Sequence, residues 1–170
     1  MVESHFCAIT LSLEVRIRMT DPAPDANVSL RRISGKTVWV ICKLSVSDSQ
    51  KGFVAPNAFS IAQAYFCRNA WFRAIYAGEI PVGFVMLHEN PKRGSYYLWR
   101  FMIDAKYQGK GYGRKALDLV IKRVRKKPKA RALTLSCHRA EGGAEVFYKM
   151  FGFDLTGKMD GEEHEMKLTF

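Results

Sequence analysis

A glycine-rich turn at residues 108–114 constrains this chain more than any other feature of its sequence. Three of its seven residues are glycines at alternate positions, and it joins an apolar, aromatic run to a strongly amphipathic segment. Glycine lacks the Cβ atom that would keep a ligand away from the backbone. The N–H groups of such a turn can converge on an anion, and a following helix adds unpaired donors and a positive dipole end. The turn therefore predicts a pyrophosphate site, with Lys110 and Arg114 supplying charge.

The spacing of the glycines separates this turn from two other phosphate-binding patterns. The P-loop sequence G-x-x-x-x-G-K-[ST] is absent. The dinucleotide pattern G-x-G-x-x-G also fails, because Arg114 stands where the third glycine is required. A glycine-rich turn without further motifs is weak evidence, and a tight turn with no ligand is the alternative at this point.

Hydrophobic periodicity and turn residues divide the rest of the chain into strands and helices. We expect strands at 28–33, 72–76, 82–88, 96–103, 132–136, 153–156 and 165–170. Helices are expected at 37–46, from Ser60 as an N-cap, between the glycine-rich turn and Pro128, and at 140–150. The order β-α-α-β-β-β-α-β-α-β-β predicts an α+β fold, with a mixed, mostly antiparallel sheet and helices on both faces.

Length and composition indicate one globular domain. With 170 residues, 48% hydrophobic and 25% charged, the chain is long enough for one core and too apolar for disorder. It contains no run of about 20 apolar residues, so we expect a soluble protein with no membrane partner. We interpret residues 1–27 as an extension and Pro/Asp-rich linker before a single domain at 28–170. An added edge strand is the alternative for the first residues.

The cysteines favour a cytoplasmic location. Cys7, Cys42, Cys67 and Cys137 are widely spaced and form no C-x-x-C pair, so neither a zinc site nor a redox dithiol is expected. No metal is assigned to the chain. A reducing compartment is the simplest interpretation of these free thiols.

A net charge of +11 indicates an anionic partner. Much of this charge lies in one run of basic residues, formed by Lys122, Arg123, Arg125, Lys126, Lys127, Lys129 and Arg131. Such a run suits a phosphate-rich cofactor or nucleic acid, and it is equally typical of a solvated helix end. Because no helix-turn-helix or RNP-like motif accompanies the run, nucleic acid is the less favoured partner.

Two motifs in order resemble the signatures of the GNAT superfamily of N-acetyltransferases. The first is Gln-x-x-Gly-x-Gly at Gln108, Gly111 and Gly113, directly after the expected strand at 96–103. The second is A-x-x-F-Y-x-x-F-G-F at 144–153. Together they cover the chain from residue 96 to its end and are highly specific in combination. The stretch at 47–57 looks like bacterial diamine and polyamine acetyltransferases.

The resemblance implies an acetyl-CoA-dependent enzyme that acetylates a primary amine by direct attack on the thioester. Backbone groups of Met102 and Ile103 would bond the pantetheine arm, where their strand splays away from its neighbour. The pyrophosphate would lie on the turn, whose residues are Gln108, Gly109, Lys110, Gly111, Tyr112, Gly113 and Arg114. Tyr148 would donate a proton to the departing thiolate. The alternative for Tyr148 is a packing role only.

One position departs from the pattern of the superfamily. Many relatives carry Asn where this chain has Glu141, and there the Asn helps to hold the cofactor arm. An acid beside an anionic cofactor is unfavourable unless it faces solvent, so no binding role is assigned to Glu141.

The acceptor amine must lose a proton before it attacks, because an ammonium group has no lone pair. An alkyl amine has a pKa of about 10.4, so a base or a water chain is needed at neutral pH. The candidate bases are Glu79, His88, Glu89 and Asp104. The last turn carries a cluster of acids, Asp160, Glu162, Glu163 and Glu165, which would attract a polyamine or form an ordinary polar turn.

Other functions stay open on the sequence alone. One is acetylation of a protein lysine or N-terminus. Another is binding without catalysis, either of CoA or of nucleic acid by the basic run. Self-association into a homodimer is also left open.

Overall fold

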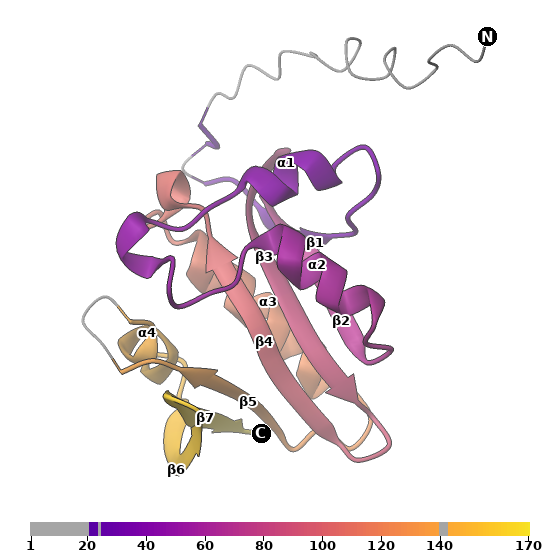
Figure 1. Cartoon of the computed structure of the whole chain (residues 1–170), viewed down its shortest axis with the longest axis vertical. Helices are drawn as coiled ribbons and strands as arrows, with labels where there is room; N and C mark the ends of the chain where they lie inside the picture. Colours follow the sequence, from indigo (N-terminus) through magenta and orange to yellow (C-terminus); the bar gives the residue numbers. More distant parts are fainter. Residues whose placement is uncertain (1–20, 24, 140–142) are drawn as a thin grey trace, which may run out of the picture.

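The computed structural model describes residues 21–23, 25–139 and 143–170, which form a seven-stranded sheet with helices on both faces (Figure 1). The strands are β1 (Val28–Arg31), β2 (Ala70–Ala77), β3 (Ile80–Asn90), β4 (Ser95–Ile103), β5 (Ala132–Cys137), β6 (Asp154–Asp160) and β7 (Glu163–Thr169). The helices are α1 (Val38–Lys43), α2 (Asn57–Tyr65), α3 (Tyr112–Arg125) and α4 (Glu145–Lys149), with short 3-10 turns η1 (Asp48–Gln50) and η2 (Ala105–Tyr107). The predicted α+β fold is confirmed.

The sheet is open between two of its central strands. Its order is β1-β2-β3-β4-β5-β7-β6, and only the β4–β5 pair is parallel. Within the described residues, β4 and β5 pair only at Tyr97 with Thr134 and at Leu98 with Leu135. Beyond Leu98 the two strands diverge (Figure 1), and β4 continues to Ile103 beside an open slot. The predicted splayed strand pair is therefore present.

Side-chain alternation along β3 gives the sheet two buried faces. Val85 and Leu87 belong to the core on the α3 side, whereas Phe84 and Met86 belong to the core beneath α1 and α2. The α3 side is completed by the apolar stripe of that helix, Ala116, Leu117, Val120, Ile121 and Val124. Successive side chains of a strand point to opposite faces, so apolar side chains along β3 are removed from water on both faces of the sheet. β3 and β4 therefore lie between the two cores.

The helix that follows the glycine-rich turn is amphipathic. It spans 14 residues and ends at Arg125, before Pro128, as predicted. Part of the predicted basic run has a structural role, because Arg123 and Lys127 form ion pairs with Glu89 of β3. In the part of the chain that the structure describes, no helix is long and apolar enough to cross a membrane.

The predicted start of α2 is wrong. The helix begins at Asn57, with Pro56 as its N-cap, and the Ser60 hydroxyl donates to the Pro56 carbonyl at 3.1 Å from inside the first turn. Asn57 is buried, and its side-chain amide donates to the Ile41 carbonyl at 2.9 Å. Docking of this amide onto α1 sets the helix start, which a local capping pattern does not reveal.

The last predicted helix is shorter than expected. Of the range 140–150, residues 140–142 lie outside the described residues, Ala144 is the N-cap and α4 ends at Lys149. Gly152 follows with a φ of 84° and donates to the Lys149 carbonyl, so its predicted role in ending the helix is confirmed. Of the predicted extension at 1–27, residues 1–20 and 24 also lie outside the described residues.

Candidate active site

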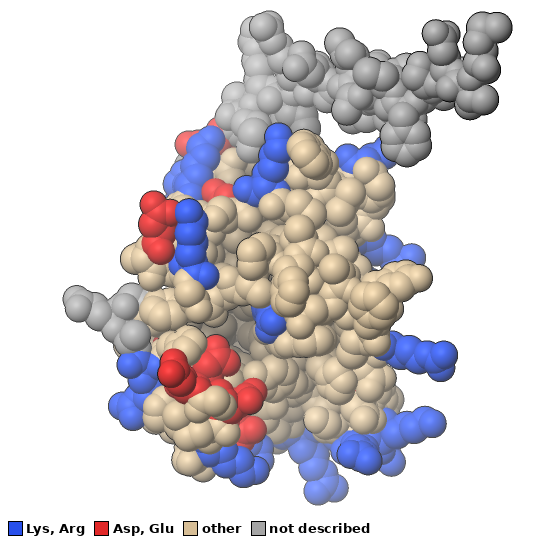
Figure 2. All heavy atoms as spheres, viewed as in Figure 1, with Lys and Arg blue, Asp and Glu red and all other residues tan. Residues whose placement is uncertain are grey.

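A hollow of about 730 Å³ opens at the splay between β4 and β5. Its walls come from β4, the glycine-rich turn, α4, the loop before α2, the end of β5 and the β6–β7 hairpin. Figure 2 shows this face of the molecule hollowed next to a group of carboxylates over the hairpin. The predicted site residues that line it are Met102, Ile103, Gln108, Gly109, Gly111, Tyr112, Gly113, Arg114 and Tyr148.

The glycine-rich turn presents its backbone to the hollow. Gly109 and Gly111 have φ angles of 74° and 79°, a left-handed conformation that residues with a Cβ rarely adopt. A Cβ at either position would project into open space. Within the described residues, the amides from Gly109 to Arg114 donate to no backbone carbonyl. They are therefore free to bind an anion, at the positive end of the α3 dipole.

Gln108 holds the turn in this conformation. Its side-chain amide donates to the Ile103 carbonyl at 2.9 Å and to Gln50 Oε1 at 2.8 Å. These bonds connect the turn to the end of β4 and to η1. Gln108 is therefore a positioning residue for the turn.

The register of β4 determines which backbone groups face the slot. The Asp104 N–H donates to the Val82 carbonyl at 2.9 Å, so at this residue the backbone points toward β3. Because the direction alternates along a strand, the N–H and C=O of Met102 also point toward β3, whereas those of Phe101 and Ile103 point into the slot. The bond from Gln108 to the Ile103 carbonyl agrees with this direction. The register favours Phe101 and Ile103 over the predicted pair of Met102 and Ile103.

The two predicted cations of the turn lie in different places. Lys110 is outside the lining of the hollow, with its ammonium 3.5 Å from Asp21, which also pairs with Lys106 at 3.1 Å. The hydrogen bond from Lys106 lowers the pKa of Asp21. Arg114 lines the hollow, and its guanidinium lies 5.8 Å from the centre of the Phe151 ring. Arg114 is therefore the better placed of the two for an anionic ligand.

Tyr148 combines burial with access to the hollow. It lies on α4, is 7% exposed and packs against the rings of Phe147 and Phe153 at 5.3 and 5.7 Å between centroids. Burial raises the pKa of the Tyr148 hydroxyl above its usual range, and charge on Cys137 and other nearby groups adds to this. A phenol in this environment keeps its proton at neutral pH and can act as a general acid.

The thiol of Cys137, next to this phenol, is a poor nucleophile at neutral pH. Cys137 is the last residue of β5 and lines the same hollow. Burial raises its pKa to about 11, and the charges of Glu145 and Glu163 add to the effect. Because the thiolate is the nucleophilic form, a thiol with this pKa is a poor acyl acceptor at neutral pH. The site favours direct transfer over an acyl-cysteine intermediate.

The four predicted bases lie away from the hollow. Glu79 and Glu89 form ion pairs with arginine or lysine side chains. Asp104 accepts hydrogen bonds from two backbone N–H groups, and His88 packs against an aromatic ring of β4. Each of the four has a structural partner, and none lines the hollow. The structure does not support any of them as the base.

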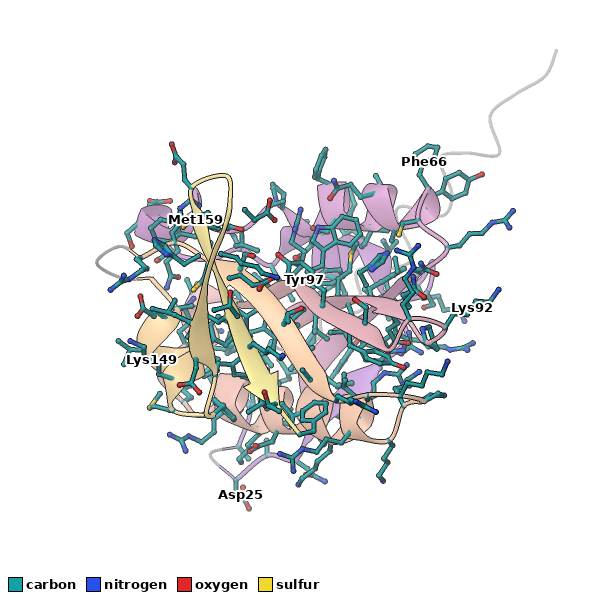
Figure 3. All side chains as sticks on the ribbon, turned by 90° about the horizontal axis from the view of Figure 1, so that it is seen from below. Asp25, Phe66, Lys92, Tyr97, Lys149 and Met159 are labelled. Atoms are coloured by element: carbon teal, nitrogen blue, oxygen red, sulfur yellow. The ribbon has the colours of Figure 1, made fainter. Side chains whose placement is uncertain are left out.

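A different set of polar residues lines the half of the hollow beyond the splay. This acceptor half contains Tyr97, His138, Asp160 and Glu163. Tyr97 is half-buried, and Figure 3 shows it near the middle of the view, on the side of the hairpin that carries Met159. Partial burial raises the Tyr97 pKa. Tyr97 and His138 carry no local sequence signal. Tyr97 reaches this wall through the β4–β5 pairing and His138 through the β5–β7 register, and both pair residues far apart in the chain.

The predicted acidic cluster divides between the hollow and the outer surface. Asp160 and Glu163 line the hollow, one at the end of β6 and one at the start of β7. Glu162 is exposed at the turn, and Glu165 accepts a hydrogen bond from Thr156 at 2.8 Å. Two of the four acids therefore border the site, as one interpretation of the cluster expected.

Two buried polar atoms also mark this hollow. In the described part of the chain, Arg100 Nε and the Tyr107 hydroxyl are buried without a hydrogen-bond partner, and both residues line the hollow. Unsatisfied buried polar atoms are uncommon and often occur at functional sites. Arg100 also donates to the Trp99 carbonyl and to Gln63, which fixes its position over the α2 side of β4. Neither orphan atom was predicted from the sequence.

Comparison with known proteins assigns the chain to a class of enzyme. Residues 36–153 match the acetyltransferase (GNAT) family, in which use of acetyl-CoA is typical. The chain belongs to this family and is an N-acetyltransferase. It is 28% identical to a spermine/spermidine N(1)-acetyltransferase of Bacillus subtilis (strain 168), across 79% of this chain and 92% of that protein.

Solved structures share the fold. An acetyltransferase from Thermus thermophilus has a TM-score of 0.70 at 16% identity, covering 85% of this chain and 97% of its own. The PaiA N-acetyltransferase from Thermoplasma acidophilum, in complex with coenzyme A, has a TM-score of 0.64 at 18% identity, covering 85% of this chain and 99% of its own. At these identities the likeness concerns the fold.

Proposed function

We propose that this N-acetyltransferase transfers the acetyl group of acetyl-CoA to a primary amine of a small, polyamine-like acceptor. The observation that carries the proposal is the slot beyond Leu98. There the backbone of β4, the free amides of the glycine-rich turn and a buried, protonated phenol share one hollow.

The thioester end and the diphosphate end of acetyl-CoA have separate binding groups. Backbone groups of Phe101 and Ile103 bond the amide-containing arm of acetyl-CoA. The arm thus pairs with β4 as a neighbouring strand would, where β5 has diverged from it. The amides from Gly109 to Arg114 bind the diphosphate, and the Arg114 guanidinium supplies a positive charge.

Acetyl transfer needs one nucleophile, one leaving group and two proton movements. The uncharged amine attacks the thioester carbonyl, and the carbon–sulfur bond breaks. The Tyr148 phenol donates a proton to the departing sulfur, because burial keeps that phenol protonated. The acetylated amine and free coenzyme A then leave. The high pKa of Cys137 supports this direct route over one through an acyl-enzyme.

The acceptor is assigned from charge and from the named relatives. Asp160 and Glu163 place two carboxylates in the acceptor half of an otherwise basic molecule. Carboxylates in a partly enclosed hollow attract a cation more strongly than they would in water. The Bacillus relatives are named as spermine or spermine/spermidine acetyltransferases. A polyamine is the small amine that this arrangement suits.

Two measurements on one preparation test the proposal. Calorimetry with acetyl-CoA and with CoA should give binding, and release of free thiol should follow addition of spermidine or spermine. A panel of other primary amines and of lysine-containing peptides runs in parallel. No heat with either nucleotide rejects the cofactor assignment. Turnover with peptides alone rejects the polyamine assignment and favours a protein acceptor.

A further inference from the structure

A histidine and a glutamate face each other in the acceptor half. His138 follows β5 and Glu163 begins β7, and the pairing of Cys137 with His164 sets their segments side by side. The His138 Nε2 atom lies 3.6 Å from Glu163 Oε1. Their side chains are 27% and 31% exposed, and both line the hollow that also contains Tyr148. They are therefore open to a ligand and partly screened from solvent.

A second contact fixes the orientation of the imidazole. The His138 ring packs against the Phe53 ring, with 5.4 Å between the centroids. Phe53 lies in the loop between η1 and α2, on another wall of the hollow. Held between an aromatic ring and a carboxylate, the imidazole is preorganised on the hollow wall.

The separation of the two side chains leaves a place for a third group. A distance of 3.6 Å is too long for a direct hydrogen bond. A nitrogen or a water molecule at about 2.9 Å from both atoms can bond to the two at once. An amine nitrogen in this place directs one hydrogen to the carboxylate and one toward the imidazole.

We propose that the acceptor nitrogen binds between Glu163 Oε1 and His138 Nε2, and that His138 is the base that removes a proton from its ammonium form before attack. The inference rests on the proposed function and assigns the missing base of that reaction. The nitrogen forms a bond to the carbonyl carbon, and the carbon–sulfur bond breaks. Starting from its ammonium form, the nitrogen loses two protons. His138 accepts the first proton and passes it to solvent, and the second, released once the nitrogen has bonded to the carbonyl carbon, replaces the proton that Tyr148 gives to the sulfur.

Geometry and chemistry divide the work between these residues. Imidazole is the side chain that most often accepts protons in catalysis near neutral pH, because its charge changes in that range. Glu163 binds the incoming ammonium and stabilises the imidazolium that forms. His138, Glu163 and Tyr148 line the same hollow, which places base and acid around one reaction centre. The other titratable or charged residues that line this hollow are Tyr97, Arg100, Tyr107, Tyr112, Arg114, Cys137 and Asp160.

The pH dependence of acetylation tests the role of His138. In His138→Gln, kcat with spermidine near neutral pH should fall by about 100-fold. Near pH 10 much of the amine is already uncharged. The fold-loss in kcat caused by His138→Gln should therefore be at least about tenfold smaller there than near neutral pH. Glu163→Gln should raise the amine KM more than it lowers kcat. Equal losses of His138→Gln at both pH values, or no loss, overturn the inference.

Matched variants separate this role from a structural one. His164 is the neighbour of Glu163, and the His164 side chain lies outside the lining of the hollow. His164→Gln should therefore keep kcat within about twofold of the wild-type value. Acetyl-CoA affinity by calorimetry should be unchanged in both histidine variants. If His138→Gln does not fold by circular dichroism, His138→Asn takes its place. A wild-type protein without CoA binding or turnover defeats the proposed function itself, whereas an active wild type with a pH-independent His138→Gln defect defeats only this inference.

Discussion

At the scale of single residues, the burial of Tyr148 and its proposed role as a proton donor both require a protonated hydroxyl. Tyr148→Phe keeps the ring contacts with Phe147 and Phe153 and removes only the hydroxyl. We expect kcat to fall by about 100-fold or more, because the thiolate leaves without a proton. Acetyl-CoA affinity should stay within about threefold, since binding and catalysis depend on different groups. Steady-state kinetics and calorimetry check the two parts, and an unchanged kcat contradicts the role of Tyr148.

The raised pKa of Tyr148 also predicts how stability changes at high pH. An unfolded tyrosine ionises near pH 10, whereas folded Tyr148 keeps its proton to higher pH. The stability contributed by this group is therefore complete below about pH 10 and is lost as the pH rises further. Urea unfolding between about pH 8 and about pH 11 measures the free energy of unfolding of both proteins. Above pH 10 this free energy should fall less steeply in Tyr148→Phe than in the wild type, by about 1.4 kcal/mol per pH unit.

The control for this alkaline effect is an exposed tyrosine. Tyr65 is 86% exposed at the end of α2. Tyr65→Phe should follow the wild-type dependence of unfolding free energy on pH. Identical slopes for Tyr148→Phe and the wild type contradict the burial argument.

At the scale of elements, the junction between the turn and α3 depends on the backbone of Gly111. Its φ of 79° makes Gly111→Ala strained by about 1 kcal/mol, and the new Cβ projects into the open side of the turn. We expect acetyl-CoA affinity to fall at least about tenfold, because the amides no longer converge on the diphosphate. Calorimetry measures the affinity, and thermal unfolding measures the strain.

A second glycine provides the matched control. Gly78 has a φ of 58° in the β2–β3 turn, and its Cβ would also meet open space. Gly78→Ala should therefore lose similar stability while keeping acetyl-CoA affinity. Equal losses of affinity in the two variants contradict a specific role for Gly111 in diphosphate binding.

The elements with local signals were predicted from the sequence, and those set by long-range contacts were not. The strand β4, the glycine-rich turn and α3 follow from alternation, glycine spacing and a helical apolar stripe. The start of α2 depends on burial of Asn57 against α1, which a Ser60 capping pattern does not report. His138 reaches Glu163 only because β5 pairs with β7. Choosing Phe101 over Met102 likewise requires the register of β4, which sequence alternation alone does not fix.

At the scale of the whole molecule, charge separates the acceptor half from the rest of the surface. The chain carries a net charge of +11, and lysines and arginines extend around much of the outline in Figure 2. The acids of the β6–β7 hairpin gather at one edge of the hollow. A polycationic acceptor is therefore repelled by the molecule at long range and attracted by Asp160 and Glu163 at short range.

Magnitudes decide which of these effects controls binding. In water, a charge about 20 Å away costs about 0.2 kcal/mol per substrate charge, so the eleven net charges cost roughly 2 kcal/mol before screening. A carboxylate at about 4 Å contributes about 1 kcal/mol in water and several times more in a partly buried hollow. Salt between about 0.02 M and about 0.3 M shortens the Debye length from roughly 20 Å to roughly 6 Å. The two carboxylates outweigh the distant repulsion.

Salt in this range screens charges about 20 Å away far more than carboxylates in contact with the amine. We therefore expect the spermidine KM of the wild type to fall modestly or stay constant as salt is added. In Asp160→Asn/Glu163→Gln the repulsion persists without the contact attraction, so KM should be higher than in the wild type at both ends of the salt series. Glu162→Gln/Asp154→Asn removes the same charge from exposed positions of the hairpin and should keep KM close to the wild-type value. Initial rates across the salt series measure each KM. A double variant at positions 160 and 163 whose KM matches that of the wild type throughout shows that these acids do not bind the amine.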